Sequence, residues 1–326
     1  MQEITRRNFI KLALSMPLIG VLSGCSWRPF GEKECLIWTS INVCSKTRQG
    51  DAHLISKNGK HYLIDGGHPE VTQTHFLPFL KQHGITHLDA VMINHPHSDH
   101  YGGIKALFEN HIKVDTLYMN MPTEQQTKWE PWGVQYQDLV DIQNLARKSG
   151  TPILPIKQGD TFVFDKNSVM EVLYIYDGIH TPIGHTDIND MSAITMIRDG
   201  KNRFLLTGDL NRGLGTYLAE HANNLKADVV KIPHHGTEDL APNSFFEKAA
   251  PRDIIITAPR YLWCSKRSNR IRDLAAKHHY GTYVNGIHGH ITVTSCGDSY
   301  TIATEKKVKE LCPGGTEKDF KPTCGA

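Results

Sequence analysis

His95-Pro96-His97-Ser98-Asp99-His100 is the stretch of this 326-residue chain that decides its fold and its chemistry. It places four side chains that can bind a metal ion, three imidazoles and a carboxylate, within six residues. The apolar run Ala90 to Ile93 precedes it and Gly102-Gly103 follows it, so we expect a turn between a strand and a helix. Such ligands suit zinc, manganese or iron. A tight turn could aim the first two histidines at one ion and the Asp99-His100 pair at a second.

Outward from this turn, short apolar runs alternate with helical patterns, which is typical of layered α/β structure. Gln135 to Lys148 and Asn269 to His278 carry apolar residues at helical spacing and are predicted surface helices. Polar clusters directly follow several apolar runs, where layered folds build their sites. The predicted strands are Leu36 to Val43, Tyr62 to Ile64, Ala90 to Ile93, Val169 to Tyr176, Ala193 to Ile197, Phe204 to Leu206, Val229 to Ile232 and Ile254 to Thr257.

Residues 1–24 are predicted to be an export signal. Thr5 to Lys11 contains paired arginines and resembles the twin-arginine consensus, and an apolar run of about eleven residues follows, against about 20 needed to span a bilayer. Leu22-Ser23-Gly24-Cys25 resembles a bacterial lipobox, which makes Cys25 the expected lipid attachment site and residues 25–34 a linker. The alternatives are a short amphipathic helix and an incidental cysteine. The protein is therefore expected at the periplasmic face of a bacterial membrane, anchored by lipid.

The mature chain is expected to be close to neutral. Without residues 1–24 the chain loses three of its 36 basic residues and one of its 34 acidic residues. A neutral chain has no overall field to gather polyanions, so strong non-specific binding of nucleic acid is not predicted.

Six cysteines follow the lipobox, and an even number outside the cytoplasm suggests disulfides. We predict one bond, between Cys312 and Cys324, which would tie down the Pro- and Gly-containing tail, residues 305–326. None of the cysteines has zinc-finger spacing, so metal binding by cysteine is not expected.

The stretch 95–100 resembles the His-x-His-x-Asp-His signature of the metallo-β-lactamase superfamily, and the resemblance covers about residues 35–304. It implies a four-layer αββα sandwich and two divalent metal ions, with zinc favoured. Asp65 then matches an aspartate that supports the metal loop without binding metal, and Asp209 matches the aspartate that bridges both ions. Of the pair His234-His235, the resemblance favours His235 as the last ligand, and His234 would face the substrate.

Four further stretches stand out: Gln49-Gly50-Asp51-Ala52, Asn189-Asp190-Met191-Ser192, Thr207-Gly208-Asp209 and Pro233-His234-His235-Gly236. They carry a closer resemblance, to the hydrolase domain of ComEC-type DNA-uptake proteins and to phosphorylcholine esterases. Two stretches depart from that group, Cys44 to Arg48 and Cys264 to Arg270. Most superfamily members supply one more histidine ligand in a Gly-His-Thr context, which His185 offers here, whereas the ComEC-like group often lacks it. His185 is thus either a ligand or a loop histidine.

The expected activity is a phosphodiesterase, acting on a small-molecule or nucleic-acid phosphoester through a hydroxide that bridges the two ions. Asp99, Asp209 and His234 are the expected catalytic groups, and His234 would stabilise charge or protonate the leaving oxygen. No obligate protein partner is predicted. Substrate contacts are predicted for Trp129 and Trp132 in a polar loop, Thr123 to Gly133, and for Lys266, Arg267 and Arg270.

Other readings of these residues remain open. The two tryptophans could simply pack a long loop, and the basic cluster could be a solvated helix face. The same hydroxide could attack a lactam, lactone or thioester carbonyl, which a ligand role for His185 would favour. A binding lipoprotein that is stabilised by metal and has no activity is the alternative from another class. Covalent catalysis is disfavoured because the sequence contains no Gly-x-Ser-x-Gly turn.

Overall fold

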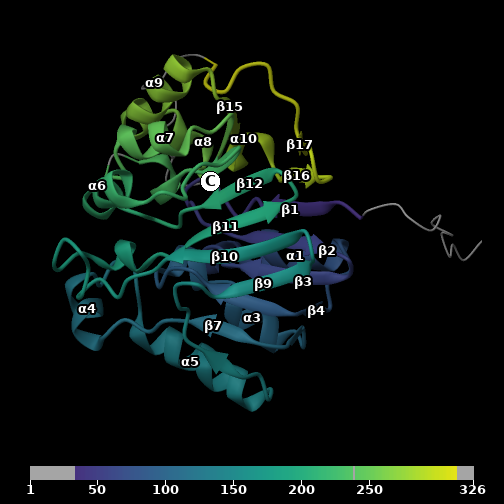
Figure 1. Ribbon diagram of the computed structural model, residues 1–326. Coiled ribbons are helices and arrows are strands. Elements are labelled where there is room, and N and C mark those ends of the chain that lie inside the picture. Colours follow the sequence, from purple (N-terminus) through teal and green to yellow (C-terminus); the bar gives the residue numbers. More distant parts are fainter. Residues whose placement is uncertain (1–33, 238, 314–326) are drawn as a thin grey trace, which may run out of the picture. The chain divides into compact units, whose positions relative to one another are not determined.

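The computed structural model describes residues 34–237 and 239–313, which are drawn in colour in Figure 1. The predicted export signal, most of the linker, Cys25 and Cys324 lie outside the described residues. None of the helices in the described part is long and apolar enough to cross a membrane.

Two β-sheets form the centre of the described part. The first has eight strands in the order β17-β16-β1-β2-β3-β5-β7-β8, and the second has seven in the order β15-β14-β13-β12-β11-β10-β9. The strands of the first sheet are β1 (Leu36–Ser40), β2 (His53–Lys57), β3 (Lys60–Ile64), β5 (Ala90–Ile93), β7 (Leu117–Met119), β8 (Ile153–Leu154), β16 (Ile291–Ser295) and β17 (Tyr300–Thr304). Those of the second are β9 (Thr161–Asp165), β10 (Ser168–Tyr174), β11 (Ile194–Asp199), β12 (Asn202–Leu206), β13 (Val229–Lys231), β14 (Asp253–Ile256) and β15 (Gly281–Val284).

Helices and short turns connect these strands. The α-helices are α1 (Leu77–Gln82), α2 (Ser98–Tyr101), α3 (Ile104–Glu109), α4 (Glu124–Trp129), α5 (Tyr136–Lys148), α6 (Arg212–His221), α7 (Asn243–Ala249), α8 (Arg260–Trp263), α9 (Asn269–His278) and α10 (Asn285–His288). The 3-10 turns are η1 (Pro69–Val71), η3 (Ile188–Met191), η4 (Pro233–Gly236) and η5 (Lys266–Ser268), and η2 (Thr72–Phe76) is a π-helical turn. A separate two-stranded sheet pairs β4 (His87–Leu88) with β6 (Lys113–Val114).

Three apolar clusters hold the layers together. Alternate residues of a strand point to opposite faces of its sheet, so Tyr62 and Ile64 of β3 meet the second sheet while Leu63 faces helices. In β12, Phe204 and Leu206 likewise lie between the sheets and Leu205 faces the other way. Residues of α1, α3 and α5 pack in the cluster outside the first sheet. Residues of α6 to α9 pack in the cluster outside the second sheet. The layer order is αββα, as predicted.

The predicted elements are confirmed, with one correction. All eight predicted strands form, as β1, β3, β5 and β10 to β14, and the two predicted helices are α5 and α9. The polar segment Thr123 to Gly133 was predicted as a loop, and this is wrong because it contains α4. The Thr123 side chain accepts from the Gln126 amide while the Gln126 side chain accepts from the Thr123 amide, and this capping box starts the helix.

The predicted bond between Cys312 and Cys324 is wrong, because Cys312 is bonded to Cys264. After β17 the chain packs Leu311 and Cys312 against the cluster outside the second sheet, where Cys264 is buried at the end of α8. The tail is thus tied to the domain. A second disulfide joins Cys35 and Cys296, which flank the paired residues Leu36 and Ser295 of β1 and β16. Cys44 is a free, buried thiol.

Cys312→Ser is expected to lower the free energy of unfolding by about 2–4 kcal/mol, because the lost bond closes a long loop in the unfolded chain. Urea unfolding of the wild type and the variant measures the difference, and Cys264→Ser, which removes the same bond, serves as the control. In a non-reducing digest of the wild type, a peptide joining Cys312 to Cys324 would contradict the structure.

Candidate metal centre

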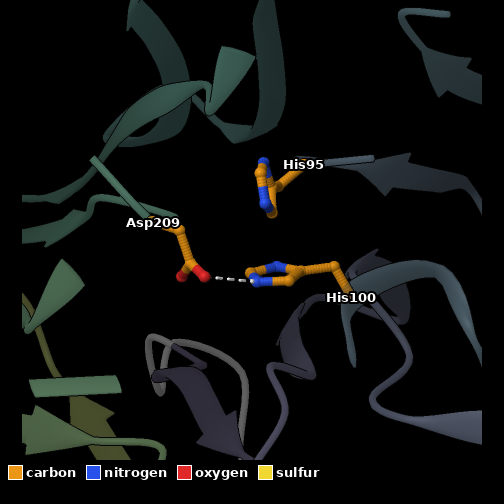
Figure 2. A group of neighbouring side chains, drawn as sticks. All are labelled: His95, His100 and Asp209. Carbon is orange, nitrogen blue, oxygen red and sulfur yellow. Dashed lines mark ion pairs between the residues drawn. The ribbon is translucent and has the colours of Figure 1, made fainter. Parts of the chain in front are cut away.

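The predicted ligands lie where strands of the two sheets end. β3 and β5 are parallel neighbours in the first sheet, and β12 and β13 are parallel neighbours in the second. Asp65 follows β3, the stretch 95–100 follows β5, Asp209 follows β12 and His235 follows β13. Because parallel strands end at the same edge of a sheet, these loops meet. Figure 2 shows the result, with the Asp209 carboxylate pointing at His100 and His95 beside both.

Four ligand atoms are spaced as the corners of one coordination site. Oδ2 of Asp209 lies 3.2 Å from Nε2 of His100 and 3.4 Å from Nε2 of His235, which in turn lies 3.2 Å from Oδ2 of Asp99. Ligands of a tetrahedral zinc ion, each about 2.0–2.2 Å from the metal, lie roughly 3.3 Å from one another. This group therefore has the spacing that a bound divalent ion requires.

A second group of ligand atoms is formed by His95, His100 and Asp209, which lie within 4.8 Å of one another. Both ring nitrogens of His95 are buried without a hydrogen-bond partner, as is Oδ1 of Asp209. Burial, reinforced by the neighbouring His97 and His100 rings, holds the pKa of His95 well below its usual range. The ring is thus neutral, which is the form that binds metal. Orphaned buried polar atoms of these types fit a metal ion better than any bond within the chain.

The histidines that face the site are held by their other ring nitrogen. His100 donates from Nδ1 to Oδ2 of Asp65 at 2.8 Å, and Asp65 also accepts from the Asn94 amide at 2.8 Å. His235 donates from Nδ1 to the Thr257 carbonyl at 3.0 Å. These bonds leave Nε2 of both rings for the site, so the supporting residues choose the ligand atom.

A family model described as the Metallo-beta-lactamase superfamily matches residues 46–258, which include the whole centre. The chain belongs to this superfamily. The predicted family is thus confirmed, and membership supports a hydrolase.

Three curated relatives show how far the similarity extends. ComE operon protein 3 of Bacillus subtilis is 27% identical over 184 residues, 56% of this chain and 21% of the relative. Recombination protein 2 of Haemophilus influenzae is 24% identical over 217 residues, 65% of this chain and 23% of the relative. Endoribonuclease ysh1 of Schizosaccharomyces pombe is 30% identical over 108 residues, 32% of this chain and 14% of the relative. The chain therefore spans less than a quarter of the length of these relatives.

Among solved structures, the metallo-beta-lactamase fold protein YhfI from Bacillus subtilis matches 76% of this chain and 95% of its own. The TM-score is 0.47 and the sequence identity 14%.

In this metallo-β-lactamase superfamily member, the sequence prediction missed the ion pair of Asp51 and Lys231. Lys231 is fully buried; its ammonium contacts the Asp51 carboxylate, donates to the Gly208 carbonyl at 2.9 Å and lies 3.5 Å from Oδ1 of Asp209. Burial alone would raise the pKa of Asp51, but Lys231 and His100 hold it well below its usual range. The sequence did offer one signal of this pair, because Lys231 is a lysine in the otherwise apolar strand β13.

His234 lies beside the centre, whereas His185 lies outside the ligand groups. His234 is half-buried beside His235, with the ring centroids 6.4 Å apart, and its Nδ1 has no hydrogen-bond partner. His185 is exposed and packs edge-on against Trp129, and it belongs to none of the ligand groups among the described residues.

The predicted substrate-binding residues lie on the surface. Trp129 is 48% and Trp132 78% exposed. Lys266 and Arg267 are exposed in η5. Arg270 donates to the Leu240 and Ala241 carbonyls, each at 2.8 Å, which ties α9 to the segment before α7.

Asp190, in η3 beside the centre, should make the stability of the metal-free protein depend on pH. Its Oδ1 accepts from the Asn211 amide at 3.0 Å, and burial raises its pKa to about 7 despite that bond, with a contribution from Asp187. Because the folded protein keeps this proton at pH values where the unfolded chain has released it, stability falls as the pH rises from about 4 to about 7. Above that range a buried charge opposes folding.

Asp190→Asn is therefore expected to raise the free energy of unfolding by a few kcal/mol at pH 8, and to change it little at about pH 4. Urea unfolding of both proteins in a chelator measures the two differences. An equal difference at both pH values would show that the carboxyl does not titrate in this range.

Proposed function

We propose that this protein is a metal-dependent phosphodiesterase. The position of His185 is the observation that carries the proposal. In the described structure this histidine packs on Trp129 outside the ligand groups, so an ion held by His95 would lack the third histidine that most superfamily members supply. A coordination sphere with an open place can accept a phosphate oxygen of the substrate. The name of the relative Endoribonuclease ysh1, which describes an enzyme acting on a phosphodiester, supports the same class.

In this proposal His95, His97 and Asp209 would hold one ion, and Asp99, His100, Asp209 and His235 would hold the other. Two divalent ions would supply a hydroxide at neutral pH and neutralise charge on the phosphate oxygens.

The remaining residues orient this machinery and move a proton. Lys231, buried against Asp51 and Asp209, fixes the Asp209 carboxylate between the ligand groups. His234, with a free Nδ1, protonates the leaving oxygen. Burial lowers the pKa of His234, so the ring is mostly neutral at neutral pH and must first take up a proton from water before it gives one to the leaving oxygen.

We further propose that the protein is exported and carries a lipid on Cys25. The paired arginines and the Leu22 to Cys25 stretch support this, and two disulfides in the described part suit an oxidising compartment. The intact mass of the protein from a membrane fraction tests it. A chain that begins at Met1, or a Cys25 without an adduct, would refute the proposal.

A substrate panel tests the activity. The purified, zinc-loaded protein is assayed with bis-p-nitrophenyl phosphate, DNA, a phosphorylcholine ester and a chromogenic lactam. We expect turnover of at least one phosphodiester and no turnover of the lactam. Hydrolysis of the lactam without any phosphoester activity would favour carbonyl chemistry, and bound metal without turnover of any substrate would favour a binding protein.

A further inference from the structure

Glu130 brings a buried carboxylate to the metal centre from outside the ligand-bearing strands. It directly follows α4 and is only 8% exposed. Its Oε2 lies 3.2 Å from Nε2 of His97, and its Oε1 accepts from the Ile188 amide at 2.7 Å. The carboxylate thus touches both the loop that carries the first ligands and the start of η3.

The surrounding chain fits closely around the His97 ring. Gly133 approaches so near that an added Cβ would lie 2.7 Å from Cδ2 and from Nε2 of His97. The Gly133 carbonyl also accepts from the Ser98 amide at 2.8 Å. The segment from Glu130 to Gly133 therefore encloses the Nε2 edge of the ring, so this nitrogen is turned toward protein.

The other supported histidines show what such a contact does. His100 is held through Nδ1 by Asp65 and His235 through Nδ1 by the Thr257 carbonyl, and both present Nε2 to the ligand groups. An acceptor on one ring nitrogen fixes the proton there and leaves the lone pair on the other nitrogen. On His97 the carboxylate lies beside Nε2 instead, at 3.2 Å, and this buried nitrogen makes no hydrogen bond to any other group of the described residues.

We propose that Glu130 is a positioning residue that accepts a hydrogen bond from Nε2 of His97, so that Nδ1 is the atom His97 presents to metal. The inference rests on the proposed metal centre and is independent of the substrate. It gives α4 a role in the centre, because the same carboxylate ties the end of this helix to Ile188. Ile188 begins η3, and Ser192, the residue directly after η3, accepts a hydrogen bond from the Asp209 amide at 2.8 Å.

Glu130→Gln separates this role from simple packing. The Ile188 amide can only donate, so the glutamine oxygen stays with it and the NH2 group turns to His97. Nε2 must then accept, and the ring proton moves to Nδ1, which blocks the ligand atom. We expect zinc affinity at one of the two ions to fall about 10–100-fold, with the second ion retained. Glu130→Ala should lose the same affinity, and Glu124→Gln, an exposed site on α4, should lose none.

The measurements are zinc competition with a chromophoric chelator and long-range 1H–15N spectra of the histidine rings. The wild type should show His97 protonated on Nε2 and Glu130→Gln should show it protonated on Nδ1. Wild-type zinc affinity in Glu130→Gln, an unchanged His97 tautomer, or loss of both ions together would overturn the proposal. Neither readout uses substrate, so a failure of the phosphodiesterase proposal is detected separately.

Discussion

Replacing Asp209 with alanine is expected to remove bound metal and to reduce phosphodiester hydrolysis by more than about 100-fold. Loss of a residue that merely supports a metal ligand lowers metal affinity or activity about 10–100-fold. Asp209 belongs to the centre itself, so its loss should have a larger effect. Its Oδ2 lies within 3.4 Å of Nε2 of both His100 and His235. Removing the carboxylate takes away the ligand atom that lies beside both rings, although Lys231 keeps Asp51 and His100 keeps Asp65 as charged partners. Metal analysis of the purified variant and its steady-state rate measure the two losses.

Asp298→Ala is the matched control for that substitution. Asp298 is exposed and pairs with exposed Lys201, so its removal should leave metal content and rate as in the wild type. Undiminished turnover in Asp209→Ala would contradict the proposed centre. The same two measurements on His97→Ala are expected to show loss of metal and activity as well.

His234→Ala is expected to keep its metal and to lower kcat by about 100- to 10,000-fold, the range over which general acid–base groups contribute. The neighbouring His235→Ala should instead lose metal. The two adjacent histidines differ because His235 is buried with Nε2 directed at Asp99 and Asp209, whereas His234 is half-buried with an unpartnered Nδ1. Both have left-handed φ, near +50°, and this tight turn sends consecutive side chains in different directions.

The metal content and the kcat of His234→Ala and His235→Ala decide which of the two histidines binds metal. Loss of metal in His234→Ala, or full metal content in His235→Ala, would show that the roles are exchanged. Equal losses of metal in both would show that the turn, rather than one ring, holds the ion.

The parts of the centre that sequence could predict are local. The stretch 95–100 puts its ligand types within one turn, and Asp65 and Asp209 each follow an apolar strand directly. Lys231 and Asp51 could not be paired in advance, because they are distant in sequence and meet only when the two sheets pack. Glu130 was missed for the same reason, since its partners, His97 and Ile188, are brought together by the fold.

The same distinction applies to the fold. The strands that were predicted are nearly continuous apolar runs, such as β5, in which every residue is buried. β9 was missed because its apolar run is only three residues long, and β17 was missed because its half-buried and exposed residues alternate, which leaves little apolar signal in five residues. The disulfides were beyond sequence reasoning, since Cys35 and Cys296 are 261 residues apart and their pairing depends on the register of β1 with β16.

The most direct test is to titrate zinc into the metal-free protein while the hydrolysis of bis-p-nitrophenyl phosphate is followed. Two ligand sets that share Asp209 predict a rate that rises until two equivalents per chain are bound and then stays constant. Absence of phosphodiester hydrolysis at every zinc concentration, or a full rate at one equivalent, would contradict a two-metal phosphodiesterase.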